Sequence, residues 1–367
     1  MLASLWRRNN QPVPLSPTHL YPSPSPSLHI STTVAQKQSI PCPAMATASL
    51  CGRWVDGEVD LLCRHGLLDK ALNCLSQLSC PPSHDAYISL LKTCAKQRNL
   101  SYAMCVYAHI IIVHSVIPLN QWLGEHLVVA LAKCGSPNDA LFSLLRLQSR
   151  TLVSWTAVIC CFVDHGLWRD ALLMYEKMLE DGIRVDSFTF SSLFRACGNI
   201  SDLEHGRKLH ADARIAGFSS DIFIGNILIT MYRKCGSTIE AEEVFSELPS
   251  RDAISWNSML SAYVNHGEGE KALLLYRQMR EEHVPSQQSL VMALQACGML
   301  ANRDEGNAVK WRSCRIKYLD ILNGLHMEAR RNGLVSHPVL GTTLLTMYGK
   351  CGTINEAEFV SGGLSYH

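Results

Sequence analysis

The stretch "LVSWTAVICCFVDHGLWRDALLMYEKM", residues 152–178, is written a second time as "AISWNSMLSAYVNHGEGEKALLLYRQM", residues 253–279. Both copies carry Ser-Trp near the start, His-Gly in the middle, and Ala-Leu, Tyr and Met toward the end. The shared residues lie 101 positions apart throughout, from Trp155 and Trp256 onward. A fixed period of this kind indicates a repeat architecture, in which each unit packs on its neighbours.

The interval of 101 residues divides into three related units. Residues 152–186, 187–221 and 222–252 have lengths of 35, 35 and 31 residues, and each unit has its own signature. A short unit precedes them at residues 121–151, and another short unit starts at Pro338. Three unit types therefore follow one another in a fixed order.

A 16-residue expansion interrupts this order within residues 302–320. It brings basic side chains close to a tryptophan: Lys310, Trp311, Arg312, Arg315 and Lys317. We expect a solvated loop with one packing tryptophan. Contact with phosphates and a base is the alternative.

Each unit reads as two helices joined by a turn. In the unit at residues 152–186, Ala171, Leu172, Tyr175 and Met178 have the i, i+1, i+4, i+7 spacing of one helix face. Glycines stand where the first helix should end, at Gly166, Gly236, Gly267 and Gly352. Such hairpins cannot bury a face alone, so the sequence predicts an all-α fold, an α-solenoid of repeats of 31–36 residues.

Composition excludes several classes of function. The net charge of +1 offers no broad basic surface for duplex DNA. Fifteen cysteines without a CxxC pair argue against a disulfide framework and indicate a reducing compartment. No run of about 18 apolar residues occurs, so we expect no membrane span.

The first 55 residues differ from the rest because they contain no Asp or Glu. They are rich in Ser, Pro and Thr, with Arg7 and Arg8 near the start. This composition predicts a transit peptide at residues 1–50, and a disordered tail without an address is the alternative. The early arginines favour the mitochondrion, although the Ser/Pro/Thr content also fits a chloroplast address. We expect divergent repeats at 51–120 and the repeat array at 121–367.

The signatures "SWTAVICCFVDHG", "FTFSSLFRACG" and "LITMYRKCGSTIEAEEVFSELPSRD" closely resemble the pentatricopeptide repeat (PPR) family. The rotation of 35, 35 and 31 residues resembles the plant subclass built from P, L and S motifs. The resemblance covers residue 84 to the end, with a half-repeat from Asp60. It implies a right-handed superhelix that binds single-stranded RNA, one base per repeat. Because the chain stops inside an S motif, we expect a truncation before a C-terminal extension and deaminase-like domain.

In this family, position 2 of each motif clamps a base, and position 5 with the last residue reads it. The resemblance places the clamps at Trp122, Val153, Phe188, Phe223, Ile254 and Val339. It assigns Thr156/Asp186 to guanine, Asn226/Asp252 to uracil and Asn257/Ser286 to cytosine. Ser191/Asp221 spells guanine weakly, and Thr342 favours a purine. Three pairs match no base: Glu125/Thr151, Ile88/Asn120 and Val291/His337.

The implied RNA core is 5′-N-G-G-U-C-N-R-3′, read from the motif at Gln121 onward. For each single side chain, the alternative is helix-start packing or a solvated helix face. Short hydroxyl, amide and carboxylate groups can present donors and acceptors to a base edge. We expect the three readable pairs together to read bases.

The sequence contains no complete catalytic motif. A zinc deaminase needs HxE followed by PCxxC. HxE occurs at His266-Gly267-Glu268 and at His326-Met327-Glu328, and neither is followed by CxxC. GxxxxGK[ST] and GxSxG are also absent. We expect no enzyme activity, no metal, no cofactor and no small-molecule substrate.

The subclass is similar to factors that select C-to-U editing sites in plant organelles. The resemblance thus implies an organellar adaptor on single-stranded RNA, whose partners are multiple organellar RNA-editing factors and a trans-acting deaminase. The alternatives are a protein-binding α-solenoid of the tetratricopeptide kind without an RNA role, and a remnant of a longer factor. The residue at position 5 distinguishes RNA binding from protein binding, because a protein-binding groove has no reason to carry the pairs Thr/Asp, Asn/Asp and Asn/Ser at the same positions of its units.

Overall fold

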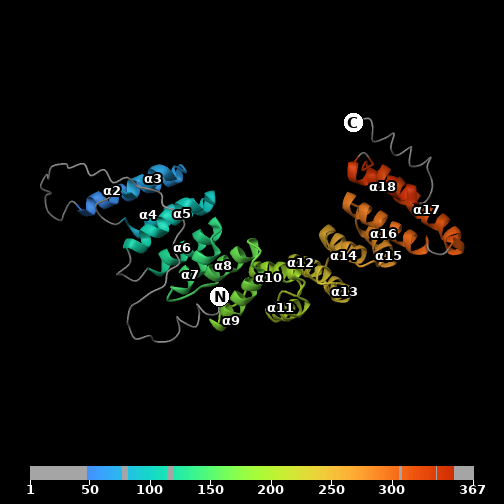
Figure 1. The fold of residues 1–367 in the computed structure, drawn as a ribbon, viewed down its shortest axis with the longest axis horizontal. Helices are drawn as coiled ribbons and strands as arrows, with labels where there is room; N and C mark the ends of the chain where they lie inside the picture. The colour runs from blue at the N-terminus through green and yellow to red at the C-terminus, as the bar shows by residue number, and fades with distance from the viewer. Residues whose placement is uncertain (1–47, 77–81, 114–119, 306–307, 336, 351–367) are drawn as a thin grey trace. The chain divides into compact units, whose positions relative to one another are not determined.

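The computed structural model describes residues 48–76, 82–113, 120–305, 308–335 and 337–350. These residues form 17 α-helices and no strand (Figure 1). The helices are α2 (Ala48–Arg64), α3 (Leu68–Ser76), α4 (His84–Gln97), α5 (Leu100–Val113), α6 (Gln121–Cys134), α7 (Pro137–Leu145), α8 (Leu152–Asp164), α9 (Trp168–Glu180), α10 (Ser187–Ile200), α11 (Leu203–Ile215), α12 (Ile222–Lys234), α13 (Thr238–Glu247), α14 (Ala253–Asn265), α15 (Gly269–Glu282), α16 (Gln287–Glu305), α17 (Ala308–Arg331) and α18 (Pro338–Lys350).

Consecutive helices pair into hairpins, from α2 with α3 to α16 with α17. Each even-numbered helix also contacts the next even-numbered helix, from α2 through to α18. The hairpins therefore stack through their first helices in chain order, as Figure 1 lets the reader follow. This arrangement confirms the predicted all-α solenoid.

The predicted apolar stripe of the second helices faces the core. Ala171 and Met178 are fully buried, and Tyr175 is 4% exposed. The first helices contribute Trp155 and Trp256, which are 1% and 2% exposed. Helices pack both within a hairpin and between neighbouring hairpins, so the stack completes the burial of these apolar side chains.

The turns inside the hairpins follow the sequence prediction where the structure describes them. Gly166 and Gly267 have φ values of +73° and +80°, and Gly236 has +82°. A residue with a side chain is strained in this left-handed region, which explains glycine at the end of these first helices. Gly352 lies outside the described residues.

The last residue of a unit also has a structural role, because it caps the first helix of the next unit. Asp186 accepts a hydrogen bond from the Thr189 amide at 2.8 Å, and Asp252 accepts one from the Ser255 amide at 2.8 Å. An N-cap of this kind stabilises a helix by about 1 kcal/mol. Helix capping is therefore one physical reason for Asp, Ser or Thr at the ends of units.

The expectation of a loop at residues 302–320 is wrong. Helices α16 and α17 are 19 and 24 residues long, against 14 and 13 residues for α10 and α11 in the related unit. The expansion lengthens both helices because it contains no proline and is rich in helix-forming residues. Lys317 is exposed. The side chains of Lys310, Trp311, Arg312 and Arg315 lie outside the described part, and so does the question of their contact with RNA.

Residues 1–47, which hold most of the expected transit peptide, lie outside the described residues. None of the described helices combines the length and apolar character needed to cross a membrane. The cysteines that the structure describes are free thiols. Burial raises the pKa of Cys94, Cys161 and Cys197 to about 12, so these thiols stay uncharged and act as small packing groups.

Candidate nucleic-acid interface

Large apolar side chains stand exposed at the second residue of six first helices. Their exposed fractions fall in a narrow range: Trp122 59%, Val153 61%, Phe188 59%, Phe223 57%, Ile254 61% and Val339 52%. The six helices belong to the row of first helices that contact one another. More than half of each of these side chains is exposed, so the six positions form a regular series of exposed flat or branched apolar groups.

Thr156 and Asp186, the expected guanine pair, are joined through a third residue. The hydroxyl of Thr189 donates to Asp186 Oδ1 at 2.6 Å, and the oxygens of Thr156 and Thr189 lie 2.7 Å apart. Since a threonine hydroxyl has one hydrogen, Thr156 must donate to Thr189. Thr189 lies at position 3 of its unit, where Ser154 and Ser255 stand in the related units, three residues after the capping residue.

Asn226 and Asp252, the expected uracil pair, are in direct contact. Asn226 Nδ2 donates to Asp252 Oδ1 at 3.1 Å, while Asn226 Oδ1 is buried without a hydrogen-bond partner. Burial alone would raise the pKa of Asp252, but hydrogen bonds from Ser255 and Asn226 outweigh it and lower this pKa. The pair therefore holds a carboxylate and an unused amide oxygen side by side.

Asn257 and Ser286, the expected cytosine pair, repeat this arrangement more loosely. Asn257 Nδ2 lies 3.5 Å from Ser286 Oγ, and Asn257 Oδ1 is again buried without a partner. A buried acceptor left unsatisfied costs about 1–3 kcal/mol. Two such oxygens at equivalent places indicate a site that is completed by a ligand or by water.

The weaker pairs are not brought together. Ser191 is 7% exposed and donates to Phe188 O of its own helix at 2.7 Å, whereas Asp221 caps α12 through the amides of Phe223 and Ile224. Thr342 donates to Val339 O, also within its own helix, at 3.0 Å. The geometry therefore separates these residues from the three paired sites.

The three pairs without a base assignment present other groups. Ile88 is 5% exposed, and Asn120 caps α6 through the Trp122 amide. Glu125 accepts from Gln121 at 3.3 Å, and Thr151 caps α8. His337 contacts Gln287 at 2.7 Å instead of Val291. Among the described residues, none of these three pairs is joined by a hydrogen bond between its two side chains of the kind that joins Asn226 and Asp252.

Both HxE sequences take part in repeat packing. His266 ends α14 and bonds through Nδ1 to Ala262 O at 2.8 Å, and Glu268 pairs with Lys271 at 2.7 Å. His326 is buried and lies 2.9 Å from the Tyr348 hydroxyl, and this burial lowers its pKa. In the described ranges, no group of three His, Cys, Asp or Glu side chains is arranged to hold a metal.

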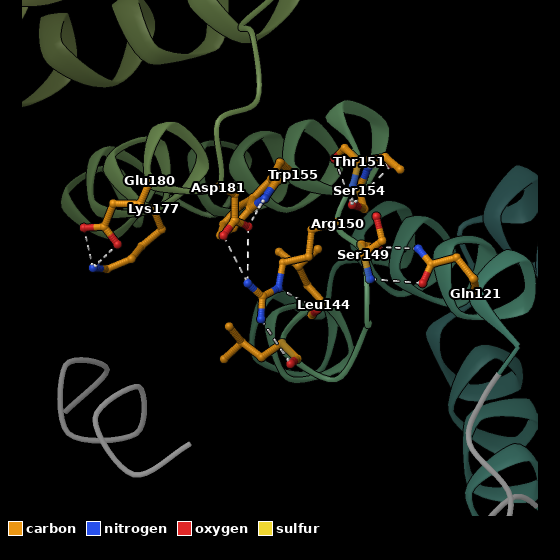
Figure 2. Close-up of polar contacts among 11 residues, drawn as sticks. Gln121, Leu144, Ser149, Arg150, Thr151, Ser154, Trp155, Lys177, Glu180 and Asp181 are labelled. Carbon is orange, nitrogen blue, oxygen red and sulfur yellow. Dashed lines mark hydrogen bonds and ion pairs between the residues drawn. The ribbon is translucent and has the colours of Figure 1, made fainter. Parts of the chain in front are cut away.

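A polar cluster that the sequence patterns did not predict surrounds the indole N–H of Trp155 (Figure 2). Asp181 Oδ2 accepts from Trp155 Nε1 at 3.0 Å and from Arg150 Nη1 at 3.2 Å. Arg150 Nε also donates to Leu144 O, the end of the preceding second helix, at 3.4 Å. The cluster joins α7, α8 and α9. The recurrence of arginine at 150 and 251 was the sequence signal that could have revealed it.

Comparison with known proteins agrees with this geometry. Residues 150–199 match the PPR repeat family, and residues 226–252 and 254–284 match the PPR repeat. The chain contains pentatricopeptide repeats. Similar PPR proteins come from Arabidopsis thaliana. A chloroplastic one is 30% identical over 83% of this chain, CRR2, also chloroplastic, is 29% identical over 82%, and a mitochondrial one is 30% identical over 75%.

This chain spans 35%, 44% and 34% of the length of those three relatives. Among solved structures, the crystal structure of maize PPR10 is 17% identical with a TM-score of 0.50, covering 85% of this chain and 53% of PPR10. A PPR10 variant in complex with an 18-nt RNA element is 18% identical with a TM-score of 0.47, covering 84% and 49%. The first of these supports the solenoid fold of the PPR repeats.

Proposed function

We propose that this chain binds single-stranded RNA in a plant organelle, one base per PPR repeat. The observation that carries the proposal is the row of exposed apolar groups beside Asn226/Asp252 and Asn257/Ser286. In each pair the asparagine holds an unused acceptor oxygen. A base needs contact on its faces and a polar partner at its edge, and this interface offers both.

The weak net charge shapes the expected mode of binding. With a formal charge of +1, phosphate contacts contribute less than in basic nucleic-acid binders. Base stacking and edge recognition then carry a larger share of the affinity. Paired bases hide those edges, so duplex RNA is a poor ligand.

Relatives support an organellar setting. The similar Arabidopsis proteins are named chloroplastic or mitochondrial, and PPR10 has been crystallised with an RNA element. The acid-free first 55 residues, with Arg7 and Arg8, favour import into the mitochondrion, with the chloroplast as the alternative.

The order of P, L and S units supports a role in RNA modification, with C-to-U editing as the leading outcome and other RNA processing as the second. In this proposal the chain positions a trans-acting deaminase, and multiple organellar RNA-editing factors bind its L units. The chain itself is no enzyme. A protein-binding solenoid without an RNA role is the alternative function.

A matched pair of isoleucine variants tests the proposal. Ile254→Ala removes a position-2 side chain that is 61% exposed, and Ile239→Ala removes one that is 67% exposed on the second helix α13. We expect Ile254→Ala to weaken binding to single-stranded RNA by about 1 kcal/mol and Ile239→Ala to leave it unchanged. Equal effects in fluorescence anisotropy titrations, or none in either variant, would favour the protein-binding alternative.

A further inference from the structure

The units that begin at Leu152 and Ala253 each contain a tryptophan and are preceded by an arginine at equivalent positions, and the hydrogen-bond partners of these side chains differ between the two units. In the first, the carboxylate of Asp181 accepts from Trp155 Nε1 and from Arg150 (Figure 2). In the second, Trp256 and Arg251 occupy the equivalent positions. Trp256 is 2% exposed and its Nε1 has no hydrogen-bond partner. Arg251 makes no ion pair within the described residues.

A change in the turn after α15 explains the difference. Asp181 and Gly182 follow α9, and Gly182 has a φ of +72°. In the second unit Glu282 ends α15, and His283 continues in extended backbone with a φ of −138°. The ring of His283 lies edge-on to Trp256 at 6.4 Å, and its Nε2 lies 3.1 Å from Arg251 O. The turn thus covers the indole ring but brings no acceptor to Nε1.

A pocket of about 520 Å³ opens at this place, between α13, α14 and α15. Its lining includes Arg251, Trp256, Tyr263, Gln278, Glu281 and Glu282. None of the position-2 or position-5 residues lines it, so the pocket is distinct from the candidate nucleic-acid interface.

The pocket lining carries one cation, Arg251, and three carboxylates, of which Glu242 is paired with Lys271. Arg251 lies over the Phe245 ring at 4.8 Å and donates to Phe245 O at 3.0 Å. Glu281 and Glu282 are exposed, and neither forms an ion pair with the described residues. A buried indole N–H and a half-buried guanidinium therefore meet an acidic rim. Such a rim repels a polyanion and attracts a ligand that carries positive charge beside its acceptor group.

We propose that this pocket receives an acidic side chain of a partner protein, from a segment in which basic residues flank that side chain. The carboxylate takes the place that Asp181 takes in the sister unit, between the arginine and the indole N–H. The flanking basic residues meet Glu281 and Glu282. A charged acceptor at the unused indole N–H forms a charge-assisted hydrogen bond away from bulk water.

An NMR titration of the ¹⁵N-labelled full chain tests this site. The indole N–H signal of Trp256 is assigned with Trp256→Phe and then followed during addition of the peptide acetyl-Lys-Asp-Lys-amide. We expect a saturable shift of that signal, and binding about tenfold weaker for the Lys-Asn-Lys peptide, because a neutral amide forms a weaker hydrogen bond. Arg251→Gln should remove the shift, whereas Arg277→Gln, at an exposed position on α15 outside the pocket, should keep it.

Four results would overturn the proposal. These are no shift of the Trp256 signal, equal shifts with both peptides, a larger shift with single-stranded RNA, or peptide binding that appears only in Glu282→Ala. The last result would mean that Glu282 fills the site itself. If Arg251→Gln does not fold, the double variant Glu281→Gln, Glu282→Gln decides. It should weaken binding of the Lys-Asp-Lys peptide severalfold, and unchanged affinity would contradict the assigned rim contacts.

Discussion

At the scale of single residues, the reader positions combine a structural role with a proposed recognition role. Asp252 caps α14 and also accepts from Asn226 Nδ2. A carboxylate only accepts hydrogen bonds, so it directs the amide N–H toward itself and leaves the buried Oδ1 without a hydrogen-bond partner. Ser286 can donate as well as accept, so the amide of Asn257 is less firmly oriented. This difference is the physical basis that we propose for distinguishing two pyrimidines.

Ser286→Asp should therefore change base preference without loss of the fold. Aspartate and serine are equally good N-caps, so the melting temperature should stay unchanged. Preference at the matching base should move from cytosine toward uracil, by about 1–3 kcal/mol by analogy with mismatches at DNA sites. Anisotropy titrations with two oligonucleotides that differ only at that base measure the change. An equal loss of affinity for both would mean that Ser286 supports the helix and does not read the base.

At the scale of helices, the cluster of Arg150, Trp155 and Asp181 connects α7, α8 and α9. The unit that begins at Ala253 has no such cluster. Asp181→Ala would leave Trp155 Nε1 buried without an acceptor, since Trp155 is 1% exposed. We expect a loss of about 1–3 kcal/mol in the free energy of unfolding. Glu282→Ala, the equivalent change in the sister unit, should cost less than about 0.5 kcal/mol, as is usual for exposed positions. Urea unfolding followed by circular dichroism compares them, and similar losses would contradict the assigned role of the cluster.

A second helix contact makes stability depend on pH. His210 on α11 lies 2.9 Å from the Tyr232 hydroxyl on α12, and burial and then Arg214 lower its pKa, partly opposed by Glu247. The unfolded chain binds a proton near the ordinary value of 6.5, whereas the folded chain resists it. The contribution of His210 to stability is therefore complete above that pH and is lost as pH falls toward the lower folded pKa.

His210→Gln should flatten this part of the stability profile. Melting temperatures measured between about pH 7.5 and pH 5 should fall less steeply in the variant than in the parent chain. His126→Gln is a suitable control, because His126 bonds to Trp122 O of its own helix at 2.9 Å. A parent profile that is flat below pH 6.5, or identical slopes for His210→Gln and the parent, would refute this explanation.

The resemblance to the PPR family implied the position-2 residues. Sequence periodicity predicted the hairpins and the glycine turns at Gly166, Gly236 and Gly267, although Ser201 takes the left-handed conformation in the unit at 187–221. It did not predict features that occur once. Asp181 and Arg150 lie 31 residues apart and have no full counterpart in the sister unit. Thr189 lies at the recurring position 3, but its link from Asp186 to Thr156 depends on side-chain geometry. The interruption of the repeat at 302–320 favours a loop, whereas local helix propensity continues both helices.

At the scale of the whole molecule, stacking through first helices places the position-2 side chains and the reader pairs in chain order. Because each hairpin depends only on its neighbours, a regular ligand with one contact per unit is the natural partner of this architecture. A strand of RNA with unpaired bases has that regularity. The central claim is thus that the order of units in the chain sets the order of bases bound.

One binding experiment tests this claim most directly. The full chain is titrated with a fluorescent single strand that contains 5′-GGUC-3′, with the same strand annealed to its complement, and with a strand whose four core bases are changed. The account predicts that the first ligand binds about tenfold or more tightly than either of the others. Equal affinity for the duplex, or for the strand with the changed core, would contradict recognition of one base by each repeat.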